Sequence, residues 1–200
     1  MRSAWRPAVF WQPAIAALGL LVSGASYADP VLKVRTGTGT PATVPTGNDY
    51  PFLDTHLVLT LDGVLETTGA GRLTFEYLGY EARSSNSFLV GGEQCFRTAN
   101  SKVGETCSAA TTAGSIDFAF RTDRSGRDAN LAVWDNRAPP RAVRSFGVGI
   151  VEEAPNRFLI LWDSGADGDY DDLGVRVVFE PKVVADVDTR GVLLAQRVSR

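Results

Sequence analysis

A run of acidic side chains late in the chain has the residue types and spacing best suited to chemistry. Residues 163–172 read DSGADGDYDD, which places five carboxylates in ten residues with no lysine or arginine among them. Like charges packed into one short turn repel each other unless water or a cation screens them. Hard cations such as Ca²⁺ take roughly six to eight oxygen ligands. The run therefore predicts a structural Ca²⁺ site with the ligands Asp163, Asp167, Asp169, Asp171 and Asp172.

A second interpretation of this acidic turn stays open, namely a solvated loop that binds nothing tightly. The turn is not an EF-hand, because that motif needs a glycine after its third acidic position and a glutamate at its twelfth. Asp172 and Val178 occupy those two places. The flanking segments also have the pattern of strands and not of helices. The sequence alone leaves the cation site and the solvated loop as alternatives.

A cluster of arginines precedes the acidic turn. Residues 121–144 contain three aspartates and six arginines, which are Arg121, Arg124, Arg127, Arg137, Arg141 and Arg144. Exposed loops between strands account for such a cluster in most proteins. The functional alternative is a patch that binds an anionic glycan or lipopolysaccharide.

Few other side chains have the pattern of a catalytic site. The single histidine, His56, begins an alternating segment, and no G-x-S-x-G motif supplies a serine nucleophile. Outside the acidic turn, Glu76 and Glu81 form the one plausible acid pair for glycoside hydrolysis, but alternation puts Glu76 on a polar strand face. Trp134 and Trp162 end apolar runs, which favours core packing over sugar stacking. We therefore expect no catalytic residues.

The first 28 residues are typical of a secretory signal peptide. Arg2 and Arg6 precede a short apolar run, and Ala28 ends a site of the A-x-A type. An uncleaved N-terminal anchor is the alternative. Cleavage would leave one domain, residues 29–200, with 18 basic and 23 acidic side chains. The sequence thus predicts a secreted or periplasmic protein with no transmembrane anchor in the mature chain.

Two cysteines agree with an exported protein. Cys95 and Cys107 would close a short loop by a disulfide, which suits an oxidising compartment. A redox or metal pair is the alternative, although the spacing is not C-x-x-C and no histidine lies nearby.

Apolar side chains recur with the alternation of β-strands over most of the mature chain. The predicted strands cover residues 31–35, 57–61, 73–77, 88–90, 116–121, 131–134, 146–150, 158–162, 175–179, 183–184 and 192–194. Residues 158–162, FLILW, are apolar throughout, as in a strand buried on both faces. The Thr-, Gly- and Pro-rich segment 36–51 is expected to be a mobile loop or extended edge. These features predict an all-β fold, an antiparallel β-sandwich, with a jelly roll as one variant.

Composition narrows the classes of function. A hydrophobic content of 44% excludes a disordered chain. The net charge of −3 argues against nucleic acid as the main ligand.

The segment FLILWDSGADGDYDDLGVRVVF, residues 158–179, resembles a run found in uncharacterised exported proteins of Gram-negative bacteria. Those proteins also have a strand like LTFEYLGYEA, residues 73–82, and many end in a PEP-CTERM sorting tag. The resemblance covers residues 71–180, and the matching positions are Asp163, Gly165, Asp169, Asp171, Asp172 and Leu173. Ser164 replaces a common aspartate, and the C-terminal VLLAQRVSR lacks the tag. The resemblance implies a secreted β-sandwich and no particular activity.

Together these features predict a non-enzymatic binding or structural protein of the cell surface or extracellular matrix. Its expected partner is a polysaccharide or a cell-surface protein. A carbohydrate-binding module or carbohydrate-active enzyme is the alternative function.

Overall fold

A computed structural model describes most of the region expected to be the mature domain. The described residues are 29–35, 41–45, 56–61, 63–81, 85–98, 100–123, 131–139, 147–164 and 168–182. The expected signal peptide and the strands expected at 183–184 and 192–194 lie outside them. So do Asp167, Arg124, Arg127, Arg141 and Arg144.

Strands form all of the regular structure in the described residues. They are β1 (Leu32–Arg35), β2 (Pro41–Pro45), β3 (His56–Leu61), β4 (Val64–Thr67), β5 (Gly71–Gly79), β6 (Ser85–Val90), β7 (Glu93–Arg97), β8 (Thr106–Thr111), β9 (Gly114–Ser115), β10 (Phe118–Asp123), β11 (Leu131–Asp135), β12 (Gly147–Ala154), β13 (Arg157–Asp163) and β14 (Leu173–Pro181). Every pairing between them is antiparallel.

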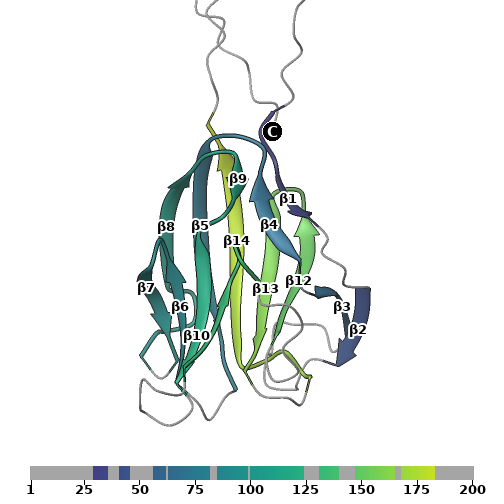
Figure 1. Ribbon diagram of the computed structural model, residues 1–200, viewed down its shortest axis with the longest axis vertical. Coiled ribbons are helices and arrows are strands. Elements are labelled where there is room, and N and C mark those ends of the chain that lie inside the picture. The colour runs from purple at the N-terminus through teal and green to yellow at the C-terminus, as the bar shows by residue number, and fades with distance from the viewer. Residues whose placement is uncertain are drawn as a thin grey trace, which may run out of the picture.

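The strands form a sandwich of two layers (Figure 1). A seven-stranded sheet has the order β2-β3-β12-β13-β14-β5-β8, and a four-stranded sheet has the order β11-β10-β6-β7. A three-stranded sheet, β1-β4-β9, adds its apolar side chains to the same core. This distribution of strands differs from the two four-stranded sheets of the jelly roll that the sequence left open.

Aromatic side chains fill the space between the layers. The ring of Phe120 in β10 stacks on Trp162 of β13, with centroids 5.3 Å apart and planes 5° from parallel. Phe75 of β5 meets Phe88 of β6 at 5.2 Å. Such pairs add about 0.5–1.5 kcal/mol beyond the burial of their apolar area. Aromatic packing therefore holds the four-stranded sheet over β5 and β13.

The outer face of the seven-stranded sheet carries a second, smaller apolar cluster. It is formed by Leu59, Leu78, Leu159 and Leu161, against which Leu61, Val151 and Tyr170 pack. All of Phe158–Trp162 is consequently buried, which confirms the prediction of a strand covered on both faces.

The all-β sandwich predicted from the sequence is confirmed, but β2, β4, β7, β8 and β9 lie outside the predicted strand ranges. Residues 41–45, in the segment expected to be a mobile loop or extended edge, form the edge strand β2, which pairs with His56–Thr60 of β3. Thr106–Thr111 forms β8, although its small side chains give no apolar alternation to predict it.

Candidate functional site

The acidic turn connects β13 to β14. Main-chain amides donate hydrogen bonds to two of its carboxylates. Asp163 Oδ2 accepts a hydrogen bond from the Gly168 amide at 3.1 Å. Asp172 Oδ2 accepts one from the Ser164 amide. Gly168 and Tyr170 have positive φ angles of 77° and 58°, which let the chain fold back on itself. These two aspartates therefore act as structural acceptors that close the turn.

Asp171 is the most deeply buried of the turn's described carboxylates, with 3% of its surface exposed against 5% for Asp163. Burial is the largest cause that raises the pKa of Asp171, to about 8, and hydrogen bonding and charge repulsion from Glu81 and Asp169 raise it further. The Glu81 amide also donates to the Asp171 carbonyl at 3.0 Å. At neutral pH the protonated Asp171 carboxyl can therefore donate to a neighbouring carboxylate and tie the turn to the end of β5.

The structure brings Glu81 into this acidic cluster, which the sequence did not indicate. Glu81 follows β5 in the chain, and the β5–β14 register, with Gly79 opposite Gly174, sets it beside the turn. Glu76, the other half of the acid pair considered from sequence, instead binds Arg176 at 2.8 Å. The two glutamates thus belong to separate networks.

The predicted metal ligands do not gather around one point in the part of the chain that the structure describes. Within it, no group of three or more histidine, cysteine, aspartate or glutamate side chains is arranged to hold a metal ion. Asp167 lies outside the described residues. Ca²⁺ binding therefore stays a prediction.

The two described arginines of the predicted anionic-ligand patch have different surroundings. Arg121 is exposed on β10. Arg137 binds Asp117 at 2.9 Å and Asp135 at 3.4 Å. The hydrogen bond to Asp135 is the largest of the causes that raise the pKa of Arg137. Arg137 is thus part of a local ion pair, and the patch as a whole stays a prediction.

The two tryptophans considered as sugar platforms lie in the core. Trp134 is 1% exposed and Trp162 is fully buried. The Trp162 indole donates to Thr122 Oγ1 at 2.9 Å, and Thr122 Oγ1 donates to Asn86 Oδ1 at 2.6 Å. Their expected role in core packing is confirmed.

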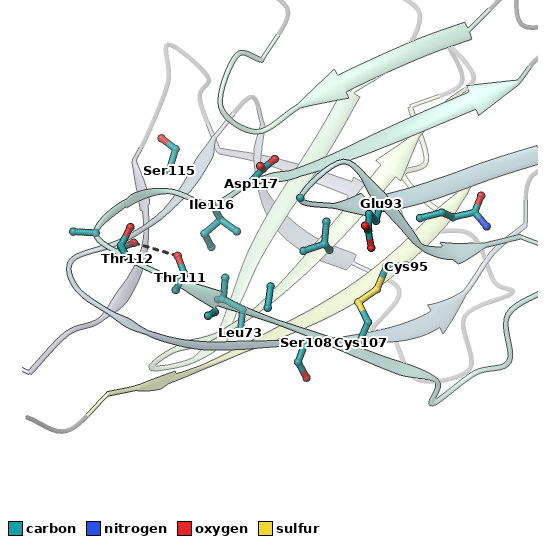
Figure 2. Close-up of a pocket in the computed structure, with 16 residues that line it drawn as sticks. Leu73, Glu93, Cys95, Cys107, Ser108, Thr111, Thr112, Ser115, Ile116 and Asp117 are labelled. Atoms are coloured by element: carbon teal, nitrogen blue, oxygen red, sulfur yellow. Dashed lines mark hydrogen bonds between the residues drawn. A yellow bond between two sulfur atoms is a disulfide. The ribbon is translucent and has the colours of Figure 1, made fainter.

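A groove of about 540 Å³ lies between the edge strands β7 and β8 (Figure 2). Its floor is apolar and includes Leu73, Val90 and Ile116. Thr111, Thr112 and Ser115 line one side, and Glu93 and Asp117 supply two carboxylates. A mostly apolar floor with a few polar groups at the rim is typical of a binding site.

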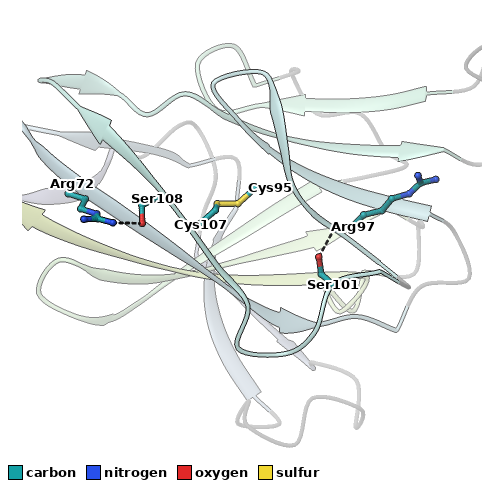
Figure 3. Close-up of a disulfide and its surroundings, with 6 residues drawn as sticks. All are labelled: Arg72, Cys95, Arg97, Ser101, Cys107 and Ser108. Atoms are coloured by element: carbon teal, nitrogen blue, oxygen red, sulfur yellow. Dashed lines mark hydrogen bonds between the residues drawn. A yellow bond between two sulfur atoms is a disulfide. The ribbon is translucent and has the colours of Figure 1, made fainter.

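A disulfide between Cys95 and Cys107 lines one end of this groove (Figures 2 and 3). The two Cα atoms are 6.1 Å apart, as a disulfide requires. Cys95 lies in the last strand of the four-stranded sheet and Cys107 in the last strand of the seven-stranded sheet. The disulfide predicted from the sequence is confirmed, and it joins the two layers at their open side.

On the side of β8 that faces away from the core, a side-chain hydrogen bond connects this strand to β5. Arg72 Nη2 donates to Ser108 Oγ at 3.1 Å (Figure 3). The groove itself was not predicted, because its lining comes from segments around residues 73, 90–95 and 107–117 that only strand pairing brings together.

Comparison with known proteins supplies no family for this arrangement. No protein-family model, curated protein or solved structure gave a significant match to the chain. Within the described residues, no helix has the length and apolar character to cross a membrane.

Proposed function

We propose that this protein is exported and acts as a non-enzymatic binding or structural protein of the cell surface or extracellular matrix. The observation that carries the proposal is the Cys95–Cys107 disulfide between the two layers. Disulfides of this structural kind persist in secreted and periplasmic proteins and are rare where thiols are kept reduced. The expected signal peptide agrees with this compartment.

The disulfide also has a mechanical consequence for binding. It joins residues 12 apart in sequence, and a loop of that length gives about 3 kcal/mol of stabilisation in the chain-entropy model. Because it joins β7 to β8, it also sets the separation of the two strands that border the groove. A preset groove lowers the conformational entropy that a ligand must overcome.

Carbohydrate recognition or cleavage is the second candidate, and Glu93 and Asp117 are the observation that favours it. Both acids line the groove, and most glycosidases need two carboxylates that flank the glycosidic bond they cleave. Asp117 is engaged by Arg137, however, and among the described residues no aromatic ring lines the groove for a sugar to stack on. Glu93→Gln and Asp117→Asn should each abolish any glycosidase activity, and their failure to do so would remove this candidate.

Processing of the full chain in a Gram-negative host tests the main proposal. We expect a periplasmic or secreted product that starts at Asp29 and whose intact mass shows no free thiol. Cys95→Ser/Cys107→Ser should be processed at the same site but be less stable. An unprocessed cytoplasmic product with two free thiols would overturn the proposal.

Ca²⁺ at the acidic turn stays a prediction, and thermal unfolding in EDTA and in millimolar CaCl₂ tests it. A ligand at about 100 times its dissociation constant stabilises by about 2.7 kcal/mol, which raises the midpoint by several degrees. Asp169→Asn should remove the rise, whereas Asp117→Asn, outside the turn, should keep it. Equal midpoints for the native chain in both buffers would refute the prediction.

A further inference from the structure

The edge strand β8 differs chemically from the other sheet edges in the described part of the chain. Natural proteins block exposed edges with prolines, charges or very short strands, since an open edge pairs readily with another chain. β9 has two residues, and the remaining edges carry Pro41 and Pro45 in β2, Lys33 and Arg35 in β1, Glu93 and Arg97 in β7, and Asp135 in β11. β8 reads TCSAAT and has neither a charge nor a proline.

The main chain of β8 presents hydrogen-bonding groups on its open side. The Tyr77 amide donates to the Glu105 carbonyl at 2.8 Å, and the Gly104 amide donates to the Tyr77 carbonyl at 2.9 Å, so the Glu105 carbonyl faces β5. In an antiparallel ladder the pairing direction alternates, so residues 107, 109 and 111 face β5. The amides and carbonyls of Thr106, Ser108 and Ala110 then point away from β5, where no strand of the described chain pairs with them.

The groove lies where a strand added to β8 would place its side chains. Cys107, Ala109 and Thr111 are half-buried on the groove side of β8, and the side chains between them are exposed. Alternate side chains of an added strand would share the groove side with them. They would meet Leu73 and Ile116 on the floor, so small apolar side chains fit best (Figure 2).

Charge indicates which kind of strand fits. The described residues that line the groove include Glu93 and Asp117, and none of them is a lysine or an arginine. Arg137 already binds Asp117, and Glu93 is exposed. A basic side chain on the added strand would complement Glu93, whereas a second copy of this chain paired through β8 would bring two acidic rims together.

We propose that β8 and the groove beside it bind an extended segment of a different polypeptide, which adds as a strand to the seven-stranded sheet. The segment places small apolar side chains in the groove and a lysine or arginine against Glu93. Main-chain hydrogen bonds to β8 supply the affinity, and the groove and Glu93 supply the specificity. This inference rests on the proposed binding function and names the partner.

Fluorescence anisotropy of a synthetic peptide tests the proposal with the full chain. The peptide alternates valine and serine and has a lysine at each end, and a second peptide has glutamate in those places. We expect the lysine peptide to bind with a dissociation constant of about 10–100 μM and at least tenfold more tightly than the glutamate peptide. N-methylation at alternate residues, which removes the donors that face β8, should abolish binding.

Two variants locate the bound peptide. Ala110→Pro removes an amide that faces away from β5, a position where an edge strand tolerates proline, and should weaken binding at least tenfold. Its matched control, Ala110→Ser, keeps the amide and should bind as the native chain does. Glu93→Lys should reverse the preference between the two peptides. Thermal unfolding of each variant verifies that it is folded.

Three results would overturn the inference. They are no binding by the native chain, equal binding by Ala110→Pro and Ala110→Ser, and a β8-dependent dimer in sedimentation that excludes the peptide. An exported, oxidised chain that ignores the peptide would defeat this inference and leave the proposed function standing. A reduced cytoplasmic chain would defeat the proposed function whatever the peptide does.

Discussion

Asn136 offers the sharpest test of how the layers are joined. Its buried side chain makes hydrogen bonds to main-chain groups of two other segments that do not pair with its own segment as strands. Its Oδ1 accepts from the Leu65 amide at 2.9 Å. Its Nδ2 donates to the carbonyls of Leu65 and Ile116 at 2.8 and 2.9 Å. The side chain is fully buried, at 0% exposure. One amide group therefore connects β4, the segment before β10, and the end of β11.

The cost of Asn136→Ala follows from these partners. The Leu65 and Ile116 carbonyls keep one main-chain hydrogen bond each, from the Ile116 and Phe118 amides. Only the Leu65 amide loses its acceptor, at about 1–3 kcal/mol, and the two lost bonds to carbonyls add about 1 kcal/mol between them. We expect a loss of about 3 kcal/mol in the free energy of unfolding, or roughly 6–12 °C in the midpoint for a domain of this size.

Urea unfolding followed by tryptophan fluorescence measures this loss, since Trp134 and Trp162 are buried. Asn100→Ala, in an exposed turn, is the control and should change stability by less than about 0.5 kcal/mol. Asn136→Asp should be least stable at neutral pH, where its carboxylate would face two carbonyls, and should recover in acid as the carboxyl gains a proton. A loss below about 1 kcal/mol for Asn136→Ala, or no pH dependence for Asn136→Asp, would refute the reasoning.

Three further changes test other parts of the fold. Since the Asp171 pKa rises to about 8 on folding, the stability that its proton supplies is complete below about pH 4 and falls as the pH rises to 8. In EDTA, Asp171→Asn should therefore gain about 2–4 kcal/mol relative to the native chain between pH 4 and pH 8 by urea unfolding, and a constant difference would contradict this. Cys95→Ser/Cys107→Ser should lose about 3 kcal/mol, and dithiothreitol should then have no further effect on its unfolding midpoint. A methyl group on Gly71 would overlap the Glu180 carbonyl, so Gly71→Ala should lose at least about 2 kcal/mol by the same assay, and a neutral result would show that β5 and β14 can move apart.

Most strands that bury large side chains could be predicted from the sequence, although β4 and β7 were missed, whereas strands built from small residues could not. Leu73, Phe75 and Tyr77 alternate with polar residues because one face of β5 packs on aromatic rings. The residues of β8 contact the core only through half-buried alanine, cysteine and threonine side chains. Their position depends on pairing with β5, a non-local interaction that leaves no periodic pattern in the sequence.

The candidate sites show the same division. The disulfide was predictable because two cysteines have one possible pairing. The acidic turn was visible as a run of charges, but the sequence could not show that Asp163 and Asp172 accept hydrogen bonds from amides. Nor could it show that Glu81 joins Asp171, since that contact depends on the register between β5 and β14.

The position of the disulfide connects the fold to the proposed binding edge. An open, uncharged edge strand exposes a protein to unwanted pairing, and the usual protections are present at the other described edges. The Cys95–Cys107 bond holds β8 beside β7. Only a strand whose side chains fit the groove between β7 and β8 can therefore pair along the whole length of β8. The same bond that stabilises the sandwich thus limits which partners the edge admits, which is how an exposed strand can serve recognition without general aggregation.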